Sequence, residues 1–537
     1  MITLHTETIV TQPIARAYLE RLPAIVERFQ QSALDAEFCT ARSRHGASRS
    51  RLVDLATLSM RGLERSTEQR TALNVLRDPQ SVVAVTGQQV GLLGGPMYTI
   101  YKIRTAVEES LRVTAATGVA TVPIFWLEDN DHDAAEAATA HILDSNQSVA
   151  DLLAWDGENA RLSVADRVID DAMVERVVTG MSMLTGQFAE PTRERYRMAY
   201  QGEVSWTDAF LRILQPYLAA WGVLVIRGSD VIRSGLHLPI LLRDVESPGE
   251  LASLATQGTT VVEDLGFRAQ ATVGAMMFFG SDESGRQKCV IDGDIVTMGT
   301  LEFSRHDLVT MAKEHPERFT PTVLARPIIQ DAILPTVVSV LGAAEIAYQA
   351  QLRECYQSCG VTAPRVVLRN GATLLDSRTE RLLSKDEYDV QWYMRSTEEV
   401  DRNIADKLTA DVLPDVAIRS SALDALIAPY LQAAEAIDQT LIAFVRAQGA
   451  GITSTLEAME GKLRSAAKKQ QAQVLDRVRA IHTIVWPTGT LQERVYPLAF
   501  WEARFGTVDL RIIVEMIARG PIGTHAVIGP SDLPTQG

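Results

Sequence analysis

Two apolar runs rich in β-branched residues form the clearest hydrophobic pattern in the first part of the chain. SVVAVT (81–86) stops at Gly87, and VATVPIFWLE (119–128) leads directly into NDHDAAEAATAH. A helical pattern lies between them, from Pro96 or Met97 to about Arg112. This order of strand, glycine-rich turn, helix and second strand predicts a βαβ unit. Both turns then lie at the carboxyl ends of parallel strands, where such sheets bind ligands.

Further apolar runs extend this α/β pattern. WGVLVI (221–226) and PRVVL (364–368) are expected to add strands to the same sheet. Residues 230–335 contain short strand-like pieces (ATVGAMMFF, KCVID, DIVTM), which predict an inserted antiparallel element. Residues 151–205 predict a smaller, largely helical insertion. We therefore expect a core over residues 1–375 that carries both insertions.

Apolar positions near the C-terminus change to alternating spacings of three and four. The first segment contains Leu423, Ile427, Tyr430, Ala434, Ile437, Leu441 and Phe444. The second contains Ile452, Leu456, Met459, Leu463, Val474, Val478, Ile481 and Val485. Together with a helix break at Gly449-Ala450-Gly451, this spacing predicts an antiparallel coiled coil within residues 376–486. The 11-residue step from Leu463 to Val474 predicts a stutter in that coiled coil. Residues 487–537 are expected to return to the core.

Composition narrows the class of protein. A length of 537 residues favours several structural units, and a net charge of −15 without a Lys/Arg run argues against nucleic acid as a partner. No apolar run approaches the ~20 residues that a membrane span needs, and MITLHTETIV lacks a signal-peptide pattern. Four cysteines are too few for a disulfide framework, and Cys355 and Cys359 are better explained as core thiols than as metal ligands. We expect a cytoplasmic protein without a metal site.

The stretch VTGQQVGLLGGPMYTIYK (85–102) is the first candidate site. It matches neither the P-loop nor the dinucleotide-binding fingerprint. Glycines permit close backbone approach, and free N–H groups at a helix start attract anions. The residues Thr86, Gly87, Gln88 and Gln89 could therefore contact an anionic ligand, although a tight turn without a ligand explains the spacing equally well.

The second candidate is Asp129-Asn130-Asp131-His132-Asp133. Carboxylates around one histidine should favour imidazolium, or favour a bound cation or amine. His132 could act as a general base, and its spacing to Glu136 would also allow a metal pair. The alternative is an acidic helix N-terminus stabilised by the helix dipole. The strand-end position favours a functional site with His132, Asp131 and Asp133 in catalytic roles.

Several strings together resemble one family. VTGQQVGLLGGPMYTIYK, PIFWLEDNDHDAAE, PERFTPTVLARPIIQDAILPTVVSVLGAAEIAY and PTGTLQER, in this order, are similar to the cysteine ligase family of bacillithiol synthesis (BshC). The resemblance implies a Rossmann-like core with connecting-peptide insertions and a coiled coil that forms a homodimer. It implies an activity that joins the carboxyl group of cysteine to the amine of glucosaminyl malate. It also implies a nucleotide, ATP or ADP, near the junction of core and coiled coil.

The resemblance assigns roles to further residues. Substrate contacts are expected from Asn130, Glu345 and Tyr348, in addition to Thr86, Gly87, Gln88 and Gln89. Nucleotide contacts are expected from Arg369, Asn370, Arg378, Gln492 and Arg494. Two departures from the family pattern are Asn130, where an acidic residue is expected, and Ala343-Ala344, where a Pro-Gly pair is expected.

Two other functions fit the same features. One is nucleotidyl transfer on the same fold, and the other is a non-catalytic, nucleotide-binding scaffold whose coiled coil is the working surface. A scaffold would not need two polar loops at strand ends, so the ligase is the preferred hypothesis.

Overall fold

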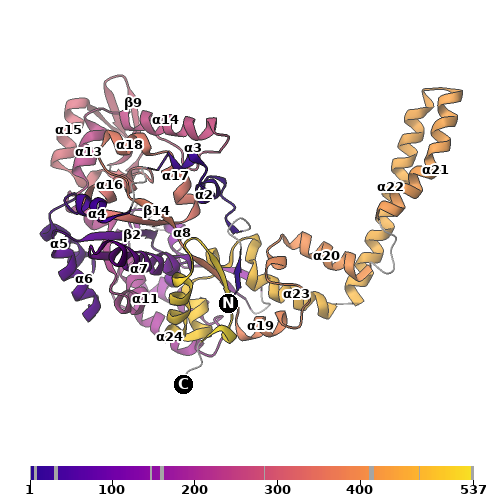
Figure 1. Cartoon of the computed structure of the whole chain (residues 1–537), viewed down its shortest axis with the longest axis horizontal. Coiled ribbons are helices and arrows are strands. Elements are labelled where there is room, and N and C mark those ends of the chain that lie inside the picture. Colours follow the sequence, from indigo (N-terminus) through magenta and orange to yellow (C-terminus); the bar gives the residue numbers. More distant parts are fainter. Residues whose placement is uncertain are drawn as a thin grey trace. The chain divides into compact units, whose positions relative to one another are not determined.

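The computed structural model describes residues 2–4, 9–29, 34–144, 148–155, 157, 162–282, 285–409, 416–470 and 472–533. The chain divides into two compact units (Figure 1). One unit consists of Met1–Asp376 together with Gln492–Gly537, and the other is Ser377–Leu491. Among the described residues, no helix is both long enough and apolar enough to cross a membrane.

A parallel five-stranded sheet forms the centre of the first unit. Its order is β14-β13-β2-β3-β6, and every neighbouring pair is parallel. The bounds are β2 Val82–Gln89, β3 Thr121–Glu128, β6 Leu224–Arg227, β13 Thr336–Leu341 and β14 Arg365–Leu368. The chain builds outward from β2 through β3 to β6, then returns to the other side of β2 with β13. This change of direction is a topological switch point, where open α/β sheets bind ligands.

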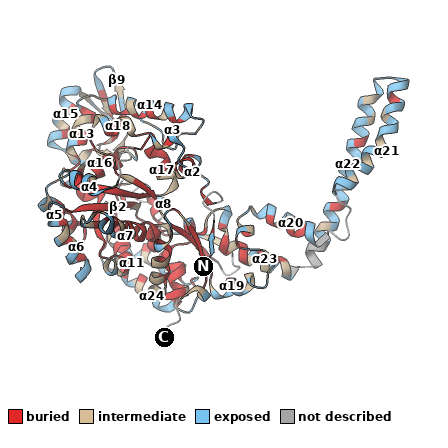
Figure 2. Cartoon of the chain, in the orientation of Figure 1, coloured by how far each residue is buried: buried red, intermediate tan, exposed pale blue. Residues whose placement is uncertain are grey.

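The strands expected from the apolar runs are confirmed, including β6 and β14. Strand β2 differs in length, since it continues past Gly87 and pairs Gly87, Gln88 and Gln89 with the end of β3. The turn that follows is short, and helix α7 (Tyr98–Thr117) then packs along β2, β3 and β13. Most residues of these strands are buried, which explains their largely apolar sequences (Figure 2).

Antiparallel strands lie within residues 230–335, and helices lie within residues 151–205. The larger one carries the antiparallel strands β7 (Phe278–Asp282), β8 (Gly285–Gln287) and β12 (Thr320–Pro321) in one sheet. A second antiparallel sheet contains β9 (Cys289–Asp292), β10 (Ile295–Met298) and β11 (Leu301–Ser304). The smaller insertion contains α9 (Asp171–Met181) and α10 (Ala189–Tyr200), preceded by the hairpin of β4 (Thr139–Leu143) and β5 (Val149–Leu153).

The C-terminal segment from Gln492 belongs to the first unit. Strand β16 (His525–Ile528) pairs with β15 (Gly371–Leu374) and with β1 (Ile2–Leu4). The 3-10 turn η6 (Gln492–Arg494) and helix α24 (Leu498–Arg519) precede it. Gly371 and His525, which are far apart in the sequence, are therefore neighbours in this sheet.

The second unit is entirely helical among its described residues. Helices α21 (Val416–Ile437) and α22 (Leu441–Gln470) form an antiparallel hairpin in which Arg419 pairs with Glu460 at 2.6 Å. Helix α23 (Ala472–Val485) packs instead against α19 (Ser377–Leu383) and α20 (Thr397–Thr409). The stutter expected between Leu463 and Val474 includes residue 471, which lies outside the described residues.

The predicted helix break at Gly449-Ala450-Gly451 is wrong, because these residues lie inside α22. The hairpin turns at residues 438–440, where the carboxylate of Asp438 accepts hydrogen bonds from the Thr440 amide and hydroxyl at 2.9 and 2.8 Å. A glycine costs a helix only about 1 kcal/mol, and packing along the hairpin offsets that amount. Asp438 provides local turn hydrogen bonds that the two glycines lack.

Candidate functional site

A cavity of about 720 Å³ opens at the carboxyl ends of the central strands. Its lining comes from β2, β3, the start of α17 (Ala343–Gln349), helix α7 and the larger insertion. All of these elements belong to the first unit. The cavity therefore occupies the switch point of the sheet, where the two candidate sequence motifs converge.

The end of β2 contributes three of the predicted residues. Gly87, Gln88 and Gln89 line the cavity. The Gln89 amide donates to Asp131 Oδ2 at 2.5 Å, which joins the two predicted motifs directly. Thr86 does not line the cavity, because its hydroxyl is buried and donates to the Val340 carbonyl at 2.8 Å. Gly94, with φ of 86°, belongs to a turn that packs against α24 rather than to the cavity lining.

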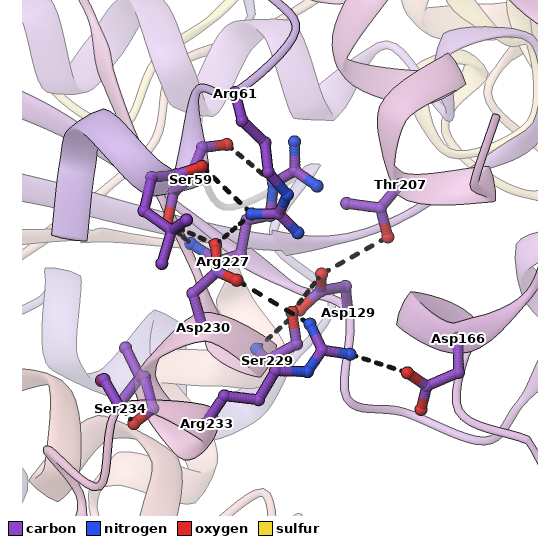
Figure 3. Close-up of polar contacts among 12 residues, drawn as sticks. Ser59, Arg61, Asp129, Asp166, Thr207, Arg227, Ser229, Asp230, Arg233 and Ser234 are labelled. Atoms are coloured by element: carbon purple, nitrogen blue, oxygen red, sulfur yellow. Dashed lines mark hydrogen bonds and ion pairs between the residues drawn. The ribbon is translucent and has the colours of Figure 1, made fainter.

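The loop after β3 divides into residues that face the cavity and one that anchors the loop. Glu128, Asn130 and Asp131 line the cavity. Asp129 points away and accepts hydrogen bonds from the Ser229 amide and hydroxyl, both at 2.8 Å, and from the Thr207 hydroxyl at 3.4 Å (Figure 3). Burial raises the pKa of Asp129 to about 6. The first acidic residue of the motif therefore holds the loop in place.

His132 and Asp133 lie just outside the cavity lining. The His132 amide donates to Asp131 Oδ1 at 2.7 Å, and its ring Nδ1 is buried with no hydrogen-bond partner among the described residues. Burial, followed by the charge of Arg286, lowers the pKa of His132. The expected imidazolium is therefore not favoured, because burial and the charge of Arg286 together outweigh the neighbouring carboxylates. Asp133 is exposed and caps α8 (Ala134–Ala137) through the Glu136 amide at 2.8 Å.

Lys102 of α7 reaches the cavity from beneath β2. Its ammonium group, which is buried, lies 2.7 Å from the Gly87 carbonyl, 3.1 Å from Gln88 Oε1 and 2.5 Å from Glu345 Oε2. Three acceptors match the three N–H bonds of an ammonium group. Burial lowers the pKa of Lys102, and the charge of Glu345 opposes that effect. Lys102 thus fixes the predicted residue Glu345 at the edge of the cavity.

A second buried cation, Arg326 of α16 (Ala325–Ile333), lies beside Gly87. A Cβ atom at position 87 would lie only 3.2 Å from Arg326 Nη1, so the glycine makes room for this guanidinium group. Burial opposes the charge of Arg326, but Tyr348, Glu128 and Glu345 more than offset it and raise its pKa. The Tyr348 hydroxyl also faces this group, and burial raises the pKa of Tyr348 to about 12. Arg326 is therefore a permanent charge in the cavity.

The larger insertion supplies the opposite wall. Arg286 of β8 pairs with Asp131 at 3.4 Å, stacks over the Phe279 ring at 3.8 Å and donates to the Pro321 carbonyl at 3.1 Å. Lys288, which is exposed, lines the same wall. The insertion therefore adds two cations and an aromatic surface to the site.

Two of the predicted nucleotide-binding residues also line the cavity. The guanidinium groups of Arg369 and Arg494 lie 5.5 and 5.7 Å from the centre of the Tyr98 ring. Arg369 also pairs with the buried Glu493 at 2.5 Å. Among the described residues, no ion pair involves the exposed side chain of Arg494. These two arginines give the cavity a cationic edge.

The other predicted nucleotide contacts lie elsewhere. The amide of Asn370 is buried, donates to the Ile517 carbonyl at 2.9 Å and accepts from the Gly523 amide at 2.8 Å. The Gln492 side chain is also buried and bonds to the backbone of Leu374 at 2.7 and 2.8 Å. Arg378 lies on α19, in the second compact unit. Asn370 and Gln492 therefore hold the framework together through hydrogen bonds to the backbone.

The cavity carries more positive than negative charge, although the chain as a whole is acidic. Its lining includes six cationic side chains, Lys102, Arg286, Lys288, Arg326, Arg369 and Arg494. It includes three carboxylates, Glu128, Asp131 and Glu345. Such a site suits an anionic ligand that also carries an amine. Within the described residues, no group of three or more His, Cys, Asp or Glu side chains is placed to hold a metal ion.

Sequence reasoning missed Lys102, Arg326, Arg286 and Glu128. Lys102 lies in the second turn of one helix and Arg326 at the start of another, so no local motif marks them. Arg286 comes from an insertion whose position depends on long-range packing. Glu128 could have been found, since it is the last residue of a predicted strand and directly precedes the acidic loop.

Comparisons with known proteins agree with this architecture. The family model "Bacillithiol biosynthesis BshC, N-terminal Rossmann-like domain" matches residues 1–370, and "Bacillithiol biosynthesis BshC, C-terminal coiled-coil domain" matches residues 372–516. A protein of Salinibacter ruber named "Putative cysteine ligase BshC" is 30% identical, over 91% of this chain and 90% of the relative. Proteins of the same name from Chlorobaculum tepidum and Heliobacterium modesticaldum are 26% and 25% identical, over 89% and 94% of this chain and 88% and 95% of the relatives.

Proposed function

Because the chain belongs to the BshC family of bacillithiol biosynthesis, we propose that it joins the carboxyl group of cysteine to the amine of glucosaminyl malate. The product is an amide that carries the thiol. The observation that best supports this reaction is the cavity at the switch point, whose lining combines six cations with three carboxylates. Glucosaminyl malate has carboxylates for the cations, and each substrate has an amino group for the carboxylates.

The reaction needs an activated carboxyl group, since a carboxylate does not condense with an amine at neutral pH. ATP would supply the activation. The cysteine carboxylate oxygen attacks a phosphorus atom of ATP, which forms an acyl phosphate with release of ADP or an acyl adenylate with release of pyrophosphate. The neutral amine then attacks the acyl carbon, the phosphate or AMP leaves, and the amine loses one proton to a base.

We assign the proton transfer to His132. Its lowered pKa keeps the ring neutral near pH 7, and Nδ1 is buried without a hydrogen-bond partner among the described residues. Asp131, which lines the cavity, orients the backbone of His132 through the amide hydrogen bond of 2.7 Å. Asp133 holds the start of α8, which follows His132. These roles support a base at the edge of the cavity.

The nucleotide is proposed to contact Arg369 and Arg494. Two guanidinium groups that flank the same aromatic ring offer planar donors for phosphate oxygens, and Tyr98 offers a surface for stacking. Calorimetric titration of ADP tests this assignment. An Arg369→Ala, Arg494→Ala double variant should bind ADP at least tenfold more weakly, and unchanged affinity would place the nucleotide elsewhere.

A homodimer is proposed to form through the α21–α22 hairpin. Its surface exposes many large apolar side chains, including Ile437 at 77% and Phe444 at 61% exposure (Figure 2). Apolar residues repeating along helices and left exposed in one chain are typical of an intermolecular coiled coil.

The activity is tested by incubating the purified protein with cysteine, glucosaminyl malate and ATP and identifying the product by mass. The expected product mass equals the sum of the two substrates less one water. Reactions without each component are the controls. ATP labelled in the α- or γ-phosphate distinguishes the ligase from a nucleotidyltransferase, because only the latter leaves a stable nucleotidyl group on the product. A wild-type protein that forms no amide under these conditions would contradict the proposed ligase.

A further inference from the structure

The cavity lining contains two groups of charged residues that differ in burial and in net charge. We infer that the more buried group binds cysteine as a zwitterion and the more exposed group binds the anionic glucosaminyl malate. We call the first group the floor (Lys102, Glu128, Arg326, Glu345 and Tyr348) and the second the rim (Asp131, Arg286, Lys288, Arg369 and Arg494). This assignment of substrates rests on the proposed function.

The floor balances its charges. It has two cations, Lys102 and Arg326, and two carboxylates, Glu128 and Glu345. The side chains of Lys102 and Arg326 are buried, at 3% and 8% exposure. A site with both signs of charge and no net charge matches an amino acid, whose ammonium and carboxylate groups are two bonds apart. A strongly anionic ligand gains less there, because two carboxylates repel it.

The carboxylate of Glu345 is held so that one oxygen remains available. Oε2 accepts from Lys102 Nζ at 2.5 Å and from the Gly342 amide at 2.7 Å. No contact of Oε1 is found among the described residues, and Glu345 lines the cavity. This oxygen can accept an ammonium N–H from the substrate. Lys102 acts as a positioning residue, because its own N–H bonds already have acceptors.

Arg326 supplies the complementary cation. Its Nη1 donates to Gln330 Oε1 at 3.0 Å, while Gly87 leaves the space in front of the guanidinium group open. Glu128, Glu345 and Tyr348 line the same cavity as Arg326, and all three raise its pKa. A substrate carboxylate can bind this guanidinium group beside the Glu345 oxygen.

The lining of the same cavity also includes an apolar, sulfur-containing wall. Met276, Phe278 and Cys289 line the cavity and are almost wholly buried. The Cys289 thiol donates to the Phe278 carbonyl at 3.4 Å, and burial raises its pKa to about 11, so it is a neutral thiol. Sulfur and aromatic surfaces suit a thiol side chain. The wall therefore favours cysteine over an amino acid with a charged side chain.

The rim carries a surplus of positive charge. Its four cations, Arg286, Lys288, Arg369 and Arg494, face one lining carboxylate, Asp131. Lys288 and Arg494 are exposed, and Arg286 and Arg369 are partly exposed. Exposed cations around an opening attract a dianion and raise its local concentration. The malate moiety is the dianion of the proposed reaction.

Two variants test the assignment by a crossed comparison of Michaelis constants. Glu345→Gln should raise KM for cysteine roughly ten- to a hundredfold, because a charged hydrogen bond to the ammonium group is lost, and should change KM for glucosaminyl malate less than threefold. Lys288→Ala, at a rim position with no proposed nucleotide contact, should show the reverse pattern. Thermal melting of each variant establishes that it is folded, and Glu128→Gln serves as a second floor variant if Glu345→Gln is unstable.

The outcomes separate this inference from the proposed function. Suppose that the wild-type enzyme forms product, but that each variant changes the two KM values equally or in the reversed pattern. The division into floor and rim is then wrong, and the proposed ligase activity is unaffected. If the wild-type protein forms no amide, the proposed function fails. Calorimetric titration of cysteine then tests whether the floor binds cysteine. Cysteine that binds the wild type and binds Glu345→Gln at least tenfold more weakly supports the floor. If cysteine binds the wild type and Glu345→Gln equally, or binds neither protein, the floor does not bind cysteine.

Discussion

The buried carboxylate of Glu493 lies 2.5 Å from the guanidinium group of Arg369 and accepts the Ala372 amide at 3.0 Å. Although burial opposes ionisation, the charge of Arg369 lowers the pKa of Glu493. Burial lowers the pKa of His525 to about 4, so its ring is neutral near pH 7. Glu493 therefore fixes the direction of Arg369 at the cavity without lining the cavity itself.

Glu493→Gln should weaken the binding of anionic ligands. The variant keeps an acceptor for the backbone but loses the charge that orients Arg369, so we expect ADP or glucosaminyl malate to bind roughly tenfold more weakly. The melting temperature should fall as well, because one partner of a buried ion pair is removed. Glu190→Gln, which removes an exposed pair with Arg193, is the matched control and should change neither quantity measurably. Unchanged ligand affinity in Glu493→Gln would contradict the positioning role.

His132→Gln should reduce the rate of amide formation about 10²–10⁴-fold, the typical cost of losing a general base. Its melting temperature should change little, because His132 is only half-buried and lies in a loop. Since the pKa of His132 is lowered from its ordinary value of 6.5, the wild-type rate should begin to decline only at a lower pH than that at which an ordinary imidazole becomes protonated. His132→Asn provides the comparison, because it also removes the base and keeps an amide. Two stable and fully active variants would show that another group takes the proton.

Asp244→Asn should reduce the pH dependence of stability. Asp244 of α13 (Leu238–Val245) is fully buried, accepts the Met277 amide at 3.0 Å, and burial raises its pKa to about 7. Because the folded state retains a proton that the unfolded state releases above about pH 4, Asp244 lowers the free energy of unfolding as pH rises from about 4 to 7, and the loss is complete above pH 7. Asparagine cannot ionise and keeps the acceptor.

Urea unfolding at pH 5 and pH 8 measures this effect. The decrease in the free energy of unfolding between the two pH values should be smaller in Asp244→Asn than in the wild type. Asp292→Asn, at an exposed position of β9, should leave the wild-type difference unchanged. Equal differences in all three proteins would show that Asp244 does not titrate in this range.

Leu441→Glu should weaken dimerisation. Leu441 begins α22 and is 40% exposed in a single chain, so a carboxylate there would be buried against the partner helices at a cost. Light scattering at micromolar concentration should give a dimer mass for the wild type and a monomer mass for the variant. Gln448→Glu, at an exposed polar position of the same helix, should remain dimeric. A wild-type monomer, or a dimeric Leu441→Glu, would exclude this interface.

The sequence predicted the features that depend on local patterns. Strands β2 and β3 were visible as β-branched runs, and because both end at one edge of the sheet, Gln89 and Asp131 could be expected near each other. Gly449 and Gly451 indicate a helix break that the structure lacks, because the hairpin turn depends on the hydrogen bonds of Asp438. The positions of Lys102 and Arg326 could not be read locally, since each depends on how its helix is placed relative to Gly87. Arg286 depends on an insertion that folds back over the sheet edge.

The order of segments along the chain has a consequence for biosynthesis. Glu493, Arg494 and strand β16 follow the whole helical unit in sequence, yet they belong to the first compact unit. Because a ribosome releases the chain from its N-terminus, the helical unit emerges before the first unit has all of its parts. A nascent chain that stops before Gln492 has the central sheet but lacks Arg494 and the carboxylate that orients Arg369. The site is therefore completed only late in translation.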